Sequence, residues 1–269
     1  MPALALMLST AIAGRVGALD PDAETAIAAV EATGATLTGT QKDAANAFIV
    51  TLKNASIWEK LDLLYLFMGG TAASHAINWR NPGTNNITWY NSPTHSANGV
   101  QFGGVAYGST GYTLGNAESL GLFAYVNSLN TVDSAFPLIA AQHDGFTLDA
   151  VLSFGTDNLV QTMIGAQSAR SGDTMPGRAT GFIFGGRSDG ENINQRVNGS
   201  DYNYLTSACG NSSPPNVPFI GAYNWEGSPT LFGDGRLAAV GLAFAPLDGI
   251  EIATMETAIT DLQTALSRA

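Results

Sequence analysis

The pattern of apolar positions divides the chain into a helical first part, a long part made of short strands, and a final helix. In the first part, Asp20 can cap a helix that begins with Pro21, and Gly34 ends it. Thr38 and Gln41 form a capping box for a second helix with an apolar stripe. Both helices are short and rich in alanine, so we expect them to dock on another surface rather than stand alone.

The long middle part alternates short apolar runs with clusters of Gly, Asn, Asp, Ser and Pro, and it shows no helical periodicity. Many short strands separated by turn signals indicate an antiparallel sandwich or barrel. A first core strand is expected in Leu61–Gly70. Further strands are expected at residues 86–91, 99–107, 120–129, 136–142, 146–154, 159–166, 180–187, 193–199, 217–224 and 236–245.

The chain ends in a predicted amphipathic helix. Asp248 and Glu251 form its cap, and Met255, Ile259, Leu262 and Leu266 recur along one narrow apolar seam. The seam could pack on the sandwich or pair with a neighbouring subunit, and packing within the molecule is the safer interpretation. The predicted parts are therefore an apolar arm (1–19), a helical attachment segment (20–60), a sandwich (61–250) and a C-terminal helix (251–269).

The composition narrows the range of partners. Charged residues make up 12% of the 269 residues, the net charge is −11, and the sequence holds 31 glycines. An acidic surface repels phosphate, so nucleic acid and anionic membranes are not expected partners. The single cysteine, Cys209, excludes an intramolecular disulfide and a cysteine-based zinc cluster.

The N-terminal residues could be mistaken for a targeting segment. Leu4–Ala13 is apolar like the core of a signal peptide, but the first basic side chain, Arg15, comes after this run instead of preceding it. We therefore favour an ordered arm that packs on the molecule or on a neighbour. No apolar run reaches the roughly 20 residues that a membrane-spanning helix needs, so we expect a soluble chain.

A serine-hydrolase motif at residues 186–190 is better explained as a turn. Gly186-Arg187-Ser188-Asp189-Gly190 fits G-x-S-x-G, which requires a helix after the serine and an acid and a histidine later in the chain. The segment after the motif instead alternates like a strand and ends in Asn198-Gly199, a hairpin dipeptide. The three histidines, His75, His95 and His143, all precede Ser188. Ser188 is therefore not expected to be a nucleophile.

Other catalytic or metal-binding patterns are weak. No predicted strand carries two acids at alternating positions, the arrangement typical of sandwich-fold glycosidases. No histidine lies in a metal-binding spacing. Asp side chains and backbone oxygens in the loops would suit calcium, although nothing in the sequence specifies such a site. We expect a non-catalytic protein that needs no cofactor.

Four aromatic residues late in the chain are the candidate ligand-binding residues: Tyr202, Tyr204, Tyr223 and Trp225. They occur in loop-like or strand-end contexts. Exposed aromatic rings stack on sugar faces and anchor protein interfaces. The alternative, that several of them cover the sandwich core, stays open.

Residues 61–258 resemble a laminin-G or concanavalin-A-like jelly-roll domain, an antiparallel sandwich. The likeness rests on LDLLYLFMGG (61–70), SLGLFAYVNS (119–128), GFIFGGRSDGENINQRVNGSDY (181–202) and the closing segment FGDGRLAAVGLAFAPLDGIEIATMETAI (232–259). The resemblance implies a jelly roll with an N-terminal helical lead and a C-terminal helix. It supplies no catalytic residues and no calcium ligands to carry over.

A narrower similarity links residues 43–82 and 89–102 to virion-associated proteins of tailed bacteriophages. Trp58, the Leu61–Gly70 strand, the pair Ser74-His75 and Asn78 occur together in it. It implies a homo-oligomeric capsid, fibre or tail component at the virion surface. Its jelly roll would face outward, and residues 1–60 would bind other virion proteins. The alternatives are a glycan-binding module for a host surface polysaccharide and a secreted polysaccharide-degrading enzyme.

Overall fold

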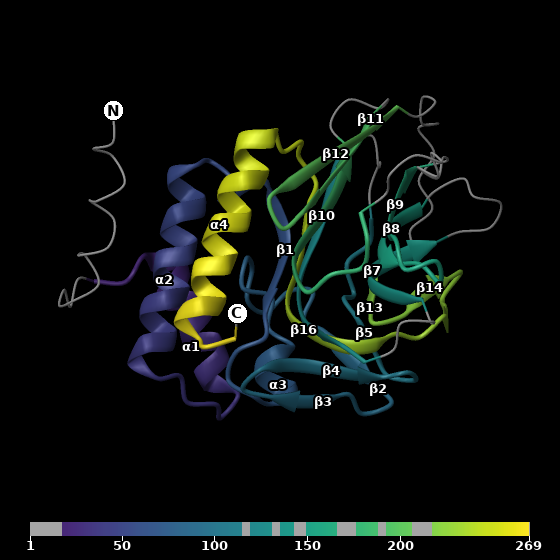
Figure 1. Cartoon of the computed structure of the whole chain (residues 1–269). Helices are drawn as coiled ribbons and strands as arrows, with labels where there is room; N and C mark the ends of the chain where they lie inside the picture. The colour runs from purple at the N-terminus through teal and green to yellow at the C-terminus, as the bar shows by residue number, and fades with distance from the viewer. Residues whose placement is uncertain are drawn as a thin grey trace, which may run out of the picture.

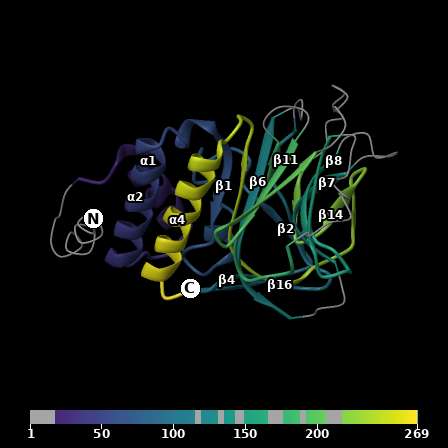
Figure 2. The same ribbon diagram turned by 45° about the horizontal axis from the view of Figure 1, so that its top comes forward.

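The computed structural model describes residues 18–114, 119–130, 135–142, 149–165, 176–187, 192–205 and 217–268. Two eight-stranded sheets, called sheet A and sheet B, pack face to face, and three helices lie outside sheet A (Figures 1 and 2). The protein is thus mainly β, with helices at both ends of the chain. None of the helices within these ranges is long and apolar enough to cross a membrane.

Sheet A contains most of the long strands. Its order is β12 (Ser200–Leu205), β11 (Asn192–Val197), β10 (Gly181–Arg187), β6 (Leu120–Leu129), β16 (Asp234–Ala243), β4 (Gly99–Gly103) and β3 (Thr94–Ser96). The eighth strand, β1 (Leu61–Leu66), pairs with the C-terminal half of β16, beyond β4.

Sheet B consists of shorter strands and is mixed. Its order is β15 (Ser228–Thr230), β14 (Tyr223–Trp225), β7 (Phe136–Gln142), β13 (Phe219–Ile220), β5 (Tyr107–Ser109) and β2 (Thr88–Tyr90), with β8 (Asp149–Phe154) joining β7 to β9 (Val160–Gly165). β14 runs parallel to β7, whereas the other pairings of the described strands are antiparallel.

The helices begin where the sequence predicts. Asp20 caps α1 (Pro21–Ala32), and capping boxes at Thr38 and Asp248 open α2 (Gly39–Asn54) and α4 (Gly249–Ala265). Two short helical turns, η1 (Trp58–Lys60) and α3 (Ala72–His75), flank β1. The long helices bury their apolar stripes in one cluster with the outer face of sheet A. Packing of the C-terminal seam within the molecule is therefore confirmed.

The hairpin after the G-x-S-x-G segment is also confirmed. β11 and β12 join through Asn198 and Gly199, whose positive φ angles of 44° and 84° are typical of a two-residue hairpin turn. β10 ends at Arg187, as the strand predicted at residues 180–187 does. A Cβ on Gly185 would lie 2.1 Å from Thr162 Oγ1 of the facing sheet. The turn predicted at Ser188–Gly190 lies outside the described residues.

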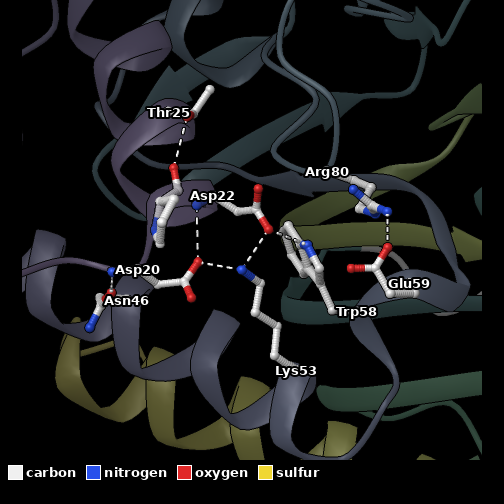
Figure 3. A network of polar contacts seen from close by, with 9 residues as sticks. Asp20, Asp22, Thr25, Asn46, Lys53, Trp58, Glu59 and Arg80 are labelled. Atoms are coloured by element: carbon white, nitrogen blue, oxygen red, sulfur yellow. Dashed lines mark hydrogen bonds and ion pairs between the residues drawn. The ribbon is translucent and has the colours of Figure 1, made fainter.

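A polar network fastens the start of α1 to α2 and η1 (Figure 3). Lys53 Nζ lies 2.6 Å from carboxylate oxygens of both Asp20 and Asp22, and the indole N–H of the buried Trp58 donates to Asp22 at 3.0 Å. Arg80 lies over the Trp58 ring. The predicted attachment segment therefore has a role within the molecule, since it completes the layer on sheet A. Residues 1–17 of the predicted apolar arm lie outside the described residues.

Substituting Trp58 separates the contribution of the indole hydrogen bond from that of ring packing. Trp58→Phe keeps most of the apolar contact but leaves Asp22 without its indole donor, so the free energy of unfolding is expected to fall by about 1–2 kcal/mol. Trp58→Ala also opens a cavity and should cost about 3–5 kcal/mol. Urea unfolding of the three proteins measures both values, and equal losses for the two variants would contradict this division.

A pair of histidines joins α3 to β3. The Nδ1 atoms of His75 and His95 are 3.1 Å apart, and Nε2 of His75 accepts the backbone N–H of Gly70 at 3.1 Å. His75 must therefore hold its proton on Nδ1 and donate it to His95. Burial, with smaller contributions from His95 and Arg268, lowers the pKa of His75 to about 3, and burial also lowers the pKa of His95. Burial thus favours the neutral form of both rings in the folded protein.

Acid is expected to weaken the fold through these two rings. The unfolded chain protonates its histidines near pH 6.5, whereas folded His75 stays neutral down to about pH 3. Between these values the unfolded state binds more protons than the folded state. The free energy of unfolding therefore decreases as the pH is lowered, by up to about 1.4 kcal/mol per pH unit for each such group. Urea unfolding from pH 7.5 to 5 measures the slope. His95→Gln, which removes one titrating ring, should reduce it, and an unchanged slope would contradict the assignment.

Candidate ligand-binding face

The two sheets differ in what lies on their outer faces. The helices cover the outer face of sheet A, whereas no helix within the described ranges lies on the outer face of sheet B (Figure 2). Five large apolar side chains are well exposed in the described part of the chain, and four of them lie on sheet B or on turns at its border. These four are Tyr90 (43% exposed), Val105 (58%), Trp225 (38%) and Leu231 (59%), and the fifth is Ile250 at the start of α4 (79%).

Strand alternation defines which side chains form this outer face. Trp89 of β2 and Ile220 of β13 point into the inter-sheet core. Because successive strand residues point to opposite faces, their neighbours Tyr90 and Phe219 point outward. The register places one outward residue from each of six strands in a row across the sheet: Thr88, Ser109, Phe219, Ala140, Val151 and Met163. Phe219, Ala140 and Val151 in the middle of this row are buried.

An aromatic stack lies at the β2 end of this face. Tyr90 and Tyr107 are cross-strand partners whose rings stack with centroids 4.7 Å apart and planes 8° apart. Tyr107 contacts Phe219 at 4.9 Å and Phe232 at 6.1 Å between centroids. Tyr107 and Phe219 are buried, whereas Tyr90 is exposed. The buried rings thus support Tyr90 from one side and hold it at the surface.

Two neighbouring turns add apolar side chains beside the stack. The backbone N–H of Gly104 donates to the carbonyl of Gly233 at 3.0 Å, which joins the turn that carries Val105 to the turn that carries Leu231. Leu231 has a φ of +47°, a conformation that a bulky side chain rarely adopts. An exposed leucine held in such a conformation is a feature that often accompanies a functional surface.

Tyr223 and Trp225 lie on the same face but differ in role. The hydroxyl of Tyr223 lies 2.8 Å from that of Ser153, and the ring packs against Ala140 and Val151. Tyr223 is almost fully buried, so it supports the face. Trp225, two residues later, points to the same side and is exposed at the end of β14. Of the two, only Trp225 presents a ring to a ligand.

Tyr202 and Tyr204 belong to the other sheet. They lie on β12, whose register places Tyr202 opposite Gln195 and Tyr204 opposite Ile193. Gln195 and Ile193 are buried, and Tyr202 packs against the inter-sheet core. The side chain of Tyr204 lies outside the described residues. The four aromatic candidates therefore do not form one site, because the β11–β12 hairpin is part of sheet A.

Clusters of metal-ligating side chains are absent from the described part of the chain. It contains no group of three or more His, Cys, Asp or Glu side chains that could hold a metal ion. Arg187, next to the predicted turn at Ser188, is buried between the sheets and donates to the carbonyl of Ile164 at 3.0 Å. His143 and Ser188 lie outside the described residues.

The exposed rings of this face should be dispensable for folding. Trp225→Ala is expected to change the free energy of unfolding by less than about 0.5 kcal/mol, and Tyr90→Ala by about 1 kcal/mol because it loses the ring stack. The buried Tyr223 behaves differently: Tyr223→Phe should cost about 1 kcal/mol and Tyr223→Ala about 3–5 kcal/mol. Urea unfolding checks this order, and a Trp225→Ala loss as large as that of Tyr223→Ala would contradict it.

No known family model matches the sequence, and no curated protein matches it in a sequence search. Among solved structures, the sialidase of Trypanosoma rangeli is similar over 77% of this chain and 33% of its own, with 17% identity and a TM-score of 0.49. The carbohydrate-binding module (CBM40) of a Ruminococcus gnavus sialidase, solved with α2,3-sialyllactose, is similar over 58% of this chain and 95% of its own, with 12% identity and a TM-score of 0.44. The NanB sialidase of Streptococcus pneumoniae is similar over 52% of this chain and 24% of its own, with 14% identity and a TM-score of 0.41.

These similarities are coarse. The chain spans about a quarter to a third of the length of the two sialidases. All three TM-scores are below 0.5, so no fold type, ligand or activity is inferred from them. None of these three solved structures is a bacteriophage protein, so the phage resemblance of the sequence gains no support from them.

Proposed function

We propose that this protein is a non-catalytic glycan-binding module that takes its ligand on the outer face of sheet B. The observation that carries this proposal is the pair of exposed rings, Tyr90 and Trp225, on a sheet face that no described helix covers. The proposal rests on this geometry and not on the coarse likeness to the sialidase module.

The arrangement suits sugars for a physical reason. The C–H groups of a sugar ring are apolar and pack on aromatic faces, while its hydroxyl groups need hydrogen-bond partners. Tyr107 and Phe219 hold the Tyr90 ring in place before any ligand arrives. A ring that is already fixed loses little conformational entropy on binding, which favours affinity.

The finer parts of the sequence prediction stay proposals. These are a concanavalin-A/laminin-G-like jelly roll, a non-enzymatic role, and display at the virion surface of a tailed phage. α1 and α2 bury their apolar stripes within the molecule. Contacts of residues 18–60 with other virion proteins would therefore use the exposed helix faces, which carry polar side chains together with Ala28, Ala32 and Ala47. Presence or absence of the protein in purified particles decides the virion setting.

A glycan array followed by calorimetric titration tests the binding function. The parent protein is expected to bind a defined set of oligosaccharides. Tyr90→Ala and Trp225→Ala should each weaken that binding at least about fivefold, since a ring–ligand contact contributes about 1–3 kcal/mol. Both substituted side chains are exposed, so unfolding is not expected to account for a loss of binding.

Ile250→Ala is the matched control. Ile250 is as apolar and even more exposed, but it lies on α4, on the helix side of the molecule. This variant should bind like the parent protein. An equal loss in Ile250→Ala, or no glycan bound by the parent at millimolar concentration, would overturn the proposed function.

A further inference from the structure

Tyr90, one of the two exposed rings, lies on a very short strand at the border of sheet B. β2 has three residues, is the last strand in the sheet order, and among the described strands pairs only with β5. After Tyr90 the chain turns through Asn91 and Ser92, whose φ angles are +57° and +53°, and then enters β3 of sheet A. A strand of three residues makes few ladder hydrogen bonds, so contacts outside the sheet are needed to fix its position.

The short helix α3 supplies such contacts before Tyr90. The backbone N–H of Ile87 donates to the carbonyl of Ala76, the residue directly after α3, at 2.8 Å. The indole N–H of Trp89 donates to the carbonyl of Ala72, the first residue of α3, at 2.9 Å. The chain that leads to Tyr90 is thus attached to both ends of this helix.

The Trp89 ring packs tightly beneath β2. Its centroid lies 6.0 Å from that of Phe67 and 6.3 Å from that of Phe102. Its register partner is Gly108, where an added Cβ would lie 2.7 Å from the indole, so the ring lies directly against the β5 backbone. Trp89 and Tyr90 are neighbours that point to opposite faces of the sheet. A shift of the Trp89 indole would therefore also move Tyr90.

The histidine pair contacts the same indole from the chain that follows Tyr90. His95 of β3 meets the Trp89 ring edge-on, with centroids 4.9 Å apart and planes at 68°. His75, the last residue of α3, is fully buried, and its Nδ1 lies 3.1 Å from Nδ1 of His95. α3, β2 and β3 lie together at one end of the sandwich (Figure 1). α3 is thus linked to the chain before Tyr90 through Trp89 and to the chain after it through His95.

From these contacts we infer that α3 positions Tyr90 for ligand binding, and that Trp89 and His95 are the positioning residues through which it acts. The inference rests on the proposed function. Tyr107 supports the Tyr90 ring by stacking, whereas α3 fixes the backbone that carries the ring. A ring held in both ways loses little conformational entropy when a ligand binds. The hydrogen bond of Trp89 therefore adds to ligand affinity, although Trp89 points away from the ligand.

The same substitution at two positions tests the inference. Trp89→Phe and Trp58→Phe each keep a ring and remove one indole hydrogen bond, to Ala72 and to Asp22 respectively. Trp89→Phe is expected to weaken binding of an oligosaccharide from the array at least about threefold, because Tyr90 must then become ordered on binding. Trp58→Phe, on the helical side, is the matched control and should change the affinity by less than about 1.5-fold. Calorimetric titration measures both, and circular dichroism checks that each variant is folded.

A second measurement needs no glycan. In protein labelled with fluorotyrosine, the fluorine NMR signal that Tyr90→Phe removes reports on the Tyr90 ring. Trp89→Phe should broaden or split this signal, as expected for a ring with more than one position. His95→Gln removes only the ring contact with Trp89 and should have the same effect, to a smaller extent. Trp58→Phe should leave the signal unchanged.

The outcomes separate the positioning role from the proposed function. Equal glycan affinities in Trp89→Phe and Trp58→Phe, or a Tyr90 signal that neither Trp89→Phe nor His95→Gln alters, would overturn the inference and leave glycan binding intact. If the parent protein binds no glycan, the proposed function fails. A Tyr90 signal that responds to Trp89→Phe and His95→Gln but not to Trp58→Phe would still support positioning of the ring by α3.

Discussion

The structure depends on the burial of sheet A on both faces. In β6, Phe123 and Tyr125 pack toward the helices, whereas Leu122, Ala124 and Val126 pack toward sheet B. A strand buried on both sides must be apolar at every position, which explains the continuous runs of β6 and β16. Both neighbouring layers result from this requirement, because exposure of either face would leave a large apolar surface in water.

The helical layer meets this requirement with segments from opposite ends of the chain. α1 and α2 precede the first strand and α4 comes after the last, yet all three share one apolar cluster with sheet A. Lys53, Asp22 and Trp58 fix the start of this layer to the sandwich by hydrogen bonds and ion pairs. Sheet B lies on the other side of sheet A, away from the helices, and its two exposed rings, Tyr90 and Trp225, are the groups from which we infer binding.

The sequence located the candidate site only in part. Tyr223 and Trp225 are predicted from the sequence and do lie on one face, but one ring is buried support and the other is exposed. The sequence groups Tyr202 with them because it is near them in the chain. In the structure, however, β12 pairs with β11 in sheet A, and the Tyr202 side chain packs against the inter-sheet core. Tyr90 is missed because its run, NITWYN, predicts a strand without revealing which face of the strand would be covered.

The sequence by itself determined the local elements, because helix caps, hairpin turns and apolar periodicity act over a few neighbouring residues. The capping boxes at Thr38 and Asp248, the Asn198-Gly199 turn and the long strands all arise from such local rules. Only the tertiary structure decided which strands pair and therefore which alternate residues face water. Tyr90 and Tyr107 become partners only through a pairing between separate strands. That pairing depends on the burial of whole sheets, a property that no short segment of the sequence contains.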